Sequence, residues 1–172
     1  LCFYHPDDAP ALKQQQLEKL RTAYEAARKV GRDLLVEIIA GKHGALGEKT
    51  IARAMSEIYD AGIMPDWWKL EPQTSAKAWA GIDDIIDARD PYCRGIVLLG
   101  LEASHEALEA GFALAQSSRQ VKGFAVGRTI FAAAAKAWLA GSMSDEEAVA
   151  DMANRFGALV AVWERLGASK AA

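Results

Sequence analysis

The sequence predicts an α/β fold built on a parallel sheet, and three observations lead to that class. Five short runs of apolar residues alternate with segments of helical composition. The alternation repeats about every 30 residues, which is the size of a βαβ unit. The apolar runs are nearly continuous instead of alternating with polar residues, as expected for parallel strands that helices cover on both faces.

The first half of the chain contains three strand–helix pairs. Residues 1–5 form an apolar strand that ends at Pro6. Residues 11–30 are rich in Leu, Ala, Gln, Glu and Lys, their apolar side chains share one face, and Gly31 follows as a helix stop. The same criteria place a second strand at 34–39, a helix at 49–59, a third strand at 66–70 and a helix at 75–87.

The second half contains two further strands and three helices. A strand over 95–101 precedes a helix over 105–115, for which Ser104 is the expected N-cap. A strand over 121–126 runs into Gly127 and Arg128. Helices over 131–139 and 145–166 complete the chain, the last one after Ser144 as cap.

Composition excludes several classes of protein. With 51% hydrophobic residues and a net charge of -3, the 172-residue chain is not disordered. Its 20 Lys and Arg do not exceed its 23 Asp and Glu, so binding of nucleic acid by bulk charge is not expected. The apolar runs are too short for a signal peptide or a bilayer span, so we expect no membrane partner. Cys2 and Cys93 form no CxxC, which favours a reducing, cytoplasmic location.

Two architectures suit five βα units: a doubly wound sheet, or part of a (β/α)8 barrel, whose complete form needs about 250 residues. Polar and glycine residues gather at the carboxyl ends of the predicted strands, where barrels build their active sites. The chain also opens inside a buried strand, without Met. We therefore expect residues 1–172 to be the last five βα units of a single barrel domain.

Lys69 is the sharpest candidate for chemistry. It lies at the end of a buried strand, and period-2 geometry puts Trp67, Lys69 and Glu71 on one face. Desolvation beside aromatic surface favours a neutral amine, which can attack a ketone and form a Schiff base. Alternatively, Lys69 is paired with Glu37 or Glu71 and only holds the strands together.

Glu37 and the turn after the last strand are further candidates. A carboxylate inside an apolar strand needs a partner, so Glu37 is either a general acid/base or the counter-ion of Lys69. Gly127 lets backbone N–H groups approach an anion at a helix N-terminus, and Arg128 could clamp a phosphate.

The histidines are weaker candidates. His5, followed by Asp7 and Asp8, either brings polar groups to the mouth of the site or belongs to a capped turn. His43 lies on a loop beside the proposed site, as a lid or simply in solvent, and His105 begins a helix. Because the three are scattered, no metal is expected, and the absence of GxGxxG and GxxxxGK[ST] motifs argues against a dinucleotide or P-loop cofactor.

Several runs resemble the aldolase-type domain of bacterial myo-inositol catabolism, which in many bacteria is fused behind a sugar-kinase domain in 5-dehydro-2-deoxygluconokinase. The resemblance covers essentially the whole chain, and it is more distant to class I tagatose-bisphosphate aldolases through Lys69-Leu70-Glu71. The runs are His-Pro-Asp-Asp at 5–8, Pro-Asp-Trp-Trp-Lys-Leu at 65–70, Arg-Gly-Ile-Val-Leu-Leu-Gly-Leu at 94–101 and Val-Lys-Gly-Phe-Ala-Val-Gly-Arg-Thr-Ile-Phe at 121–131.

The resemblance implies a class I aldolase in which Lys69 forms the Schiff base, Glu37 lies in the substrate pocket, and Gly100, Gly127 and Arg128 hold phosphate. The implied reaction cleaves 2-deoxy-5-keto-gluconate 6-phosphate into dihydroxyacetone phosphate and malonate semialdehyde, without a cofactor. Glu71 and His5 complete the predicted site. We also expect a homo-oligomer, preceded in the full protein by the rest of the barrel and a sugar-kinase domain. The alternatives are a non-catalytic sugar-phosphate-binding or assembly domain, and a metal-dependent aldolase.

Overall fold

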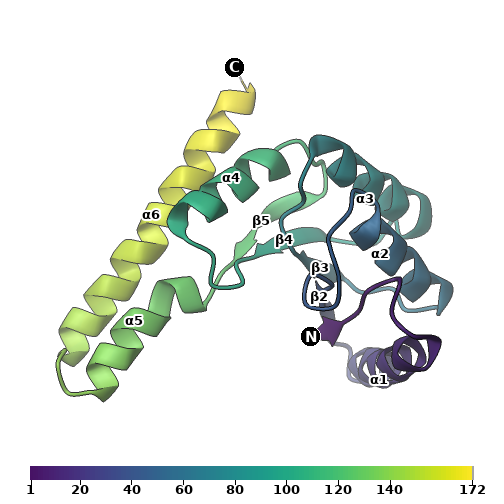
Figure 1. The fold of residues 1–172 in the computed structure, drawn as a ribbon, viewed down its shortest axis with the longest axis horizontal. Coiled ribbons are helices and arrows are strands. Elements are labelled where there is room, and N and C mark those ends of the chain that lie inside the picture. The colour runs from purple at the N-terminus through teal and green to yellow at the C-terminus, as the bar shows by residue number, and fades with distance from the viewer. Residues whose placement is uncertain (172) are drawn as a thin grey trace.

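Strands and helices alternate from residue 2 to residue 139, and a further helix follows, as the sequence predicts (Figure 1). The structure is a computed structural model that describes residues 1–171, with side chains through residue 168. The strands are β1 (Cys2–Phe3), β2 (Leu35–Ile39), β3 (Trp67–Leu70), β4 (Gly95–Leu99) and β5 (Val121–Ala125). The helices are α1 (Pro10–Lys29), α2 (Thr50–Asp60), α3 (Ala76–Arg89), α4 (His105–Ala115), α5 (Arg128–Leu139) and α6 (Asp145–Ala171).

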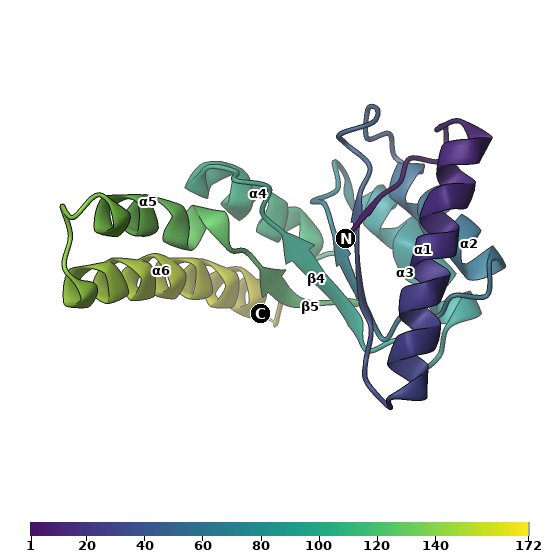
Figure 2. The same cartoon turned by 90° about the horizontal axis from the view of Figure 1, so that it is seen from below.

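The five strands form one sheet in the order β1-β2-β3-β4-β5, and every neighbouring pair is parallel. A doubly wound sheet reverses its strand order at a switch point, which this sheet does not do. Because right-handed crossovers in one direction keep the helices on one face, α1 to α4 follow one another in an arc outside the strands (Figures 1 and 2). Of the two predicted topologies, the strand order therefore argues against a doubly wound sheet.

The two faces of the sheet differ in burial. The helix-covered face carries the core, in which strand residues pack with Met55, Trp79 and Phe112 of the helices. The opposite face carries the row Glu37, Lys69, Val97 and Gly123, and all four residues are only partly buried. The expectation that helices cover both faces is therefore wrong for the described residues. The buried strand residues of this core are Cys2, Val36, Ile38, Trp68, Leu70, Ile96 and Leu98.

The boundaries of the elements differ from the predicted ones mainly at their ends. The strands are shorter than predicted, and β1 keeps only two residues. Helix α4 and its cap Ser104 lie where the sequence puts them, because the Ser104 side chain accepts a hydrogen bond from Ala107 N. Helix α5 begins at Arg128, directly after Gly127, and not at residue 131. This shift matters below because it places the N-terminus of α5 directly after Gly127.

The last two helices pack side by side and extend away from the rest of the chain (Figure 2). Helix α6 also packs on α4, where Trp163 meets Phe112 edge to face with ring centroids 5.4 Å apart. The start of α6 is a capping box, since Ser144 Oγ accepts from Glu147 N and Glu147 Oε2 accepts from Ser144 N. These contacts fix the course of the chain after β5, and thereby the place of α5.

Candidate active site

A cavity of about 410 Å³ lies at the carboxyl edge of the sheet, on its less buried face. Strands β2 to β5 and the first turn of α5 supply its walls. In α/β proteins with parallel strands, this edge is where ligands bind. The cavity contains five of the residues that the sequence singles out: Glu37, Lys69, Gly100, Gly127 and Arg128.

Lys69 and Glu37 form an ion pair in the wall of this cavity. They are register partners on adjacent parallel strands, and Lys69 Nζ lies 3.2 Å from Glu37 Oε1. Each side chain is 23% exposed, so the pair is partly desolvated but reachable from the cavity. An amine and a carboxylate at this separation can exchange a proton, which would leave a neutral, nucleophilic lysine. The same contact is also what a purely structural ion pair would show.

The wall nearest β5 is suited to an anion. Gly127 is the N-cap residue of α5 and no side chain caps the helix, while the first turn of α5 lines the cavity, so the positive end of the helix lies at the cavity wall. Arg128 is the first residue of this turn, and its Nη1 pairs with Glu102 Oε1 at 2.5 Å. The sequence indicates Gly127 and Arg128 as candidates, but it does not indicate that the Glu102 carboxylate pairs with this arginine.

Glu71 is absent from the cavity wall that the structure describes. Its buried carboxylate accepts hydrogen bonds from the backbone N–H groups of Ala40 and Gly41, at 2.8 and 3.0 Å. A side chain at position 41 would place its Cβ 2.7 Å from Glu71 Oε1, which explains the glycine there. Glu71 therefore anchors the loop that follows β2, a role that its place beside Lys69 in the sequence did not suggest.

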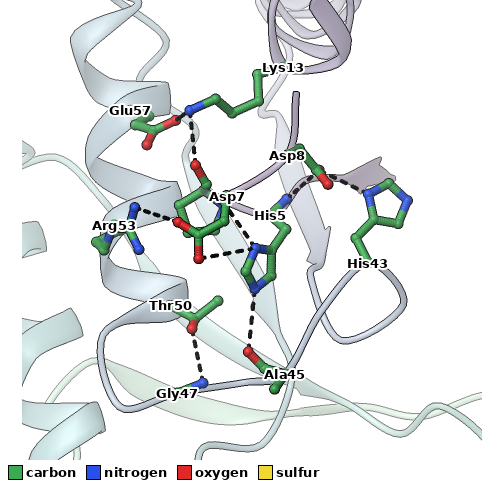
Figure 3. Close-up of polar contacts among 11 residues, drawn as sticks. His5, Asp7, Asp8, Lys13, His43, Ala45, Gly47, Thr50, Arg53 and Glu57 are labelled. Carbon is green, nitrogen blue, oxygen red and sulfur yellow. Dashed lines mark hydrogen bonds and ion pairs between the residues drawn. The ribbon is translucent and has the colours of Figure 1, made fainter. Parts of the chain in front are cut away.

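His5 likewise holds this loop instead of lining the cavity in the described residues (Figure 3). Its Nδ1 accepts from Asp7 N at 3.2 Å, which leaves Nε2 as the donor to Ala45 O at 3.3 Å. The buried ring is therefore a hydrogen-bonded bridge between the turn after β1 and the loop after β2. This arrangement matches the capped-turn alternative for 5–8.

His43 and Asp8 join the same loop to the same turn. His43 Nδ1 lies 2.9 Å from Asp8 Oδ2, and that carboxylate also accepts from His5 N (Figure 3). Burial raises the pKa of Asp8, but these two hydrogen bonds outweigh it and leave the pKa below its usual range. The His43 ring also stacks on Phe3. The sequence gives no signal for this pairing, because the partners are 35 residues apart.

The remaining candidates lie elsewhere. Cys2 and Cys93 are free thiols, and burial raises the pKa of each to about 11, so both are poor nucleophiles at neutral pH. His105 is exposed at the start of α4. Within residues 1–171, no three His, Cys, Asp or Glu side chains come close enough together to hold a metal ion.

Fold and site together define an α/β protein with a parallel sheet and a charged cavity at the carboxyl edge of its strands. A family model matches residues 1–167, and the chain belongs to this family, DUF2090, described as an uncharacterized protein conserved in bacteria. That description names no activity. No curated protein matches the sequence. None of the described helices combines the length and the apolar character that crossing a bilayer requires.

Proposed function

We propose that this protein is a carbon–carbon lyase that cleaves a phosphorylated keto-deoxy sugar acid through a Schiff base on Lys69. One observation carries the proposal: a lysine and a carboxylate 3.2 Å apart, inside a cavity that also presents an arginine and a helix N-terminus. The lysine supplies the electron sink, the carboxylate moves protons, and the cationic wall suits a phosphate. The resemblance to the aldolase-type domain of myo-inositol catabolism suggests 2-deoxy-5-keto-gluconate 6-phosphate as substrate.

The reaction balances with these groups and water alone. Lys69 passes its proton to Glu37, and the free amine attacks the ketone carbon to form a carbinolamine. Glu37 then returns this proton to the departing hydroxyl, so that loss of water gives a protonated imine and a free Glu37 carboxylate. Glu37 takes the proton of the hydroxyl two carbons away, the carbon–carbon bond breaks, and its electron pair moves into the imine to form an enamine. Malonate semialdehyde leaves. A proton returned to the enamine carbon regenerates the imine, and water releases dihydroxyacetone phosphate and Lys69.

The positions of the groups suit the shape of that substrate. Its phosphate is attached to the carbon next to the ketone, and the residues suited to phosphate lie two strands from Lys69, at the end of β5. Adjacent strands are about 4.8 Å apart, so this separation is of the size that a phosphorylated three-carbon unit and a lysine side chain can bridge. The acid end of the substrate would then point towards Glu37 and β2.

We also propose that the five βα units are part of a (β/α)8 barrel. The strand order without reversal supports a barrel, and so does a sheet face that carries charged side chains beside a cavity. In a closed barrel that face would line the interior, and further βα units would surround Lys69. A fused sugar-kinase domain and self-association stay predictions.

Borohydride trapping tests the lyase. The protein is incubated with 2-deoxy-5-keto-gluconate 6-phosphate, reduced, digested and analysed by mass spectrometry. We expect a substrate-derived adduct on the peptide that contains Lys69. Lys122 is the control, because its Nζ donates to Arg119 O outside the cavity. Cleavage of the substrate without an adduct on Lys69 would contradict the Schiff-base mechanism.

The Lys69–Glu37 contact also favours a second candidate, a sugar-phosphate-binding domain without activity, because a permanent ion pair would keep the lysine charged. Such a protein would bind phosphate esters without turnover, and Lys69→Ala would leave that binding unchanged. The trapping experiment therefore separates the two candidates.

A further inference from the structure

Glu102 occupies the position in which an anionic ligand would meet Arg128. The two side chains line the same cavity and pair at 2.5 Å. They are 58% and 59% exposed, so a ligand can reach the pair from solvent. Exposed ion pairs are weak, whereas a guanidinium holds a phosphate through two charge-assisted hydrogen bonds. A phosphate can therefore displace Glu102 from the arginine.

The backbone at Glu102 has an unfavourable conformation. Leu101 and Glu102 both have positive φ angles, 46° and 62°, a region that residues other than glycine rarely adopt. Two hydrogen bonds fix the strained turn: Ala103 N donates to Gly100 O, and Thr129 Oγ1 donates to Ala103 O. The second bond ties the turn directly to the first turn of α5. Strained residues of this kind gather at ligand sites, where the surrounding structure enforces them.

We infer that Glu102 is a built-in competitor for the substrate's anionic group, and that it makes the Arg128 site selective for phosphate over carboxylate. If a ligand carboxylate displaced Glu102, it would only replace one singly charged group at Arg128 with another. A phosphate monoester carries nearly two charges at neutral pH and more acceptor oxygens, so it gains from the exchange. The inference rests on the proposed function in one respect, because it takes the ligand to be phosphorylated.

For a keto sugar acid with a phosphate at one end and a carboxylate at the other, this selectivity has a consequence. Both ends could reach a bare arginine, and binding with the carboxylate on Arg128 would bring the wrong carbons to Lys69. Glu102 disfavours that reversed orientation. It is thus a specificity-determining residue, and it does not need to touch the reacting atoms.

Anion titration of the full chain tests the inference without any need for catalysis. Inorganic phosphate and acetate are titrated into the wild type and Glu102→Gln, with binding followed by calorimetry or by amide shifts of the first turn of α5. We expect Glu102→Gln to bind phosphate about tenfold more tightly and to gain measurable acetate binding, which lowers the preference for phosphate. Arg128→Gln should lose both. Glu102→Ala repeats the test with a second neutral side chain.

Glu109→Gln is the matched control, since Glu109 pairs with Arg165 in an exposed contact at 2.6 Å outside the cavity. It should bind both anions as the wild type does. Unchanged or weaker phosphate binding in Glu102→Gln would overturn the inference, even if Lys69 is trapped. Tighter phosphate binding in Glu102→Gln without an adduct on Lys69 would instead support the inference and contradict the proposed lyase activity.

Discussion

At the β1–β2 end of the carboxyl edge, His5, Asp8 and His43 bond to one another and to nearby backbone, whereas at the β3–β5 end Lys69 and Arg128 face a cavity. Both ends carry charged and polar residues that follow parallel strands. At the first end these groups are satisfied within the chain and build a loop. At the second end the pairs are half-buried or exposed and can exchange partners with a ligand. Position at a strand's carboxyl end is therefore not enough to mark a functional residue.

The largest expected effect is on activity at the β3–β5 end. Lys69→Met should lower turnover of the proposed substrate by roughly 10³-fold or more, because no other lysine lines the cavity in the described residues. The free energy of unfolding should change by only about 1 kcal/mol, because the lost ion pair is partly solvated. A coupled assay for dihydroxyacetone phosphate and urea unfolding measure the two quantities. Lys122→Met is the control. Substantial turnover in Lys69→Met would contradict a functional role for the β3–β5 end.

The next largest effect is on the free energy of unfolding, at the β1–β2 end of the sheet. Glu71→Ala leaves the buried N–H of Ala40 and that of Gly41 without their acceptor, which should cost about 2–3 kcal/mol in the free energy of unfolding. Glu71→Gln keeps one acceptor oxygen and should recover most of that loss. Urea unfolding measures both variants. A stable Glu71→Ala protein with a raised KM would instead place Glu71 among the substrate ligands.

The fold class was predictable because it depends on periodicity and composition. Apolar runs and helical segments alternate along the chain, and the observed elements follow them within a few residues. Burial of the sheet was harder to predict, because an apolar strand does not tell which of its faces meets a helix. The start of α5 at Arg128 was missed because Arg128 and Thr129 have no strong helix signal, and only the tertiary position of Gly127 decides it.

The site was predictable where the sequence spacing itself sets the geometry. Glu37 lies inside one apolar run and Lys69 lies near the end of the next, and adjacent parallel strands bring such residues together. The roles of His5 and Glu71 were not predictable in the same way. Their partners are backbone groups of a loop 30 to 40 residues away, and no side-chain pattern records a hydrogen bond to a backbone amide. The position of the Glu102 side chain depends on two positive φ angles, and the residues around it in the sequence do not predict them.

A smaller effect tests the close packing of the loop that follows β2. A Cβ on Gly44 would lie 2.9 Å from His5 Nε2, so Gly44→Ala should push the ring from Ala45 O and destabilise the protein by about 1 kcal/mol. Gly81→Ala in α3 is the matched variant, since open space surrounds that position and alanine favours helix by up to about 1 kcal/mol. Thermal unfolding should therefore shift in opposite directions. Shifts of the same sign would show that His5 does not fill this space.

The smallest effect separates charge from shape at the β1–β2 end. Because the pKa of Asp8 lies below its usual range in the folded protein, the unfolded chain binds the proton more tightly. The stability that Asp8 contributes is then complete above its unfolded pKa of about 3.9 and is lost as the pH falls through the lower folded pKa. Asp8→Asn should therefore be less stable than the wild type by about 0.5 kcal/mol at pH 6, and this difference should close below about pH 4. Urea unfolding at several pH values measures it, with the exposed Asp84→Asn as control. A difference that stays constant with pH would mean that the shape of Asp8, not its charge, holds His43 and the loop.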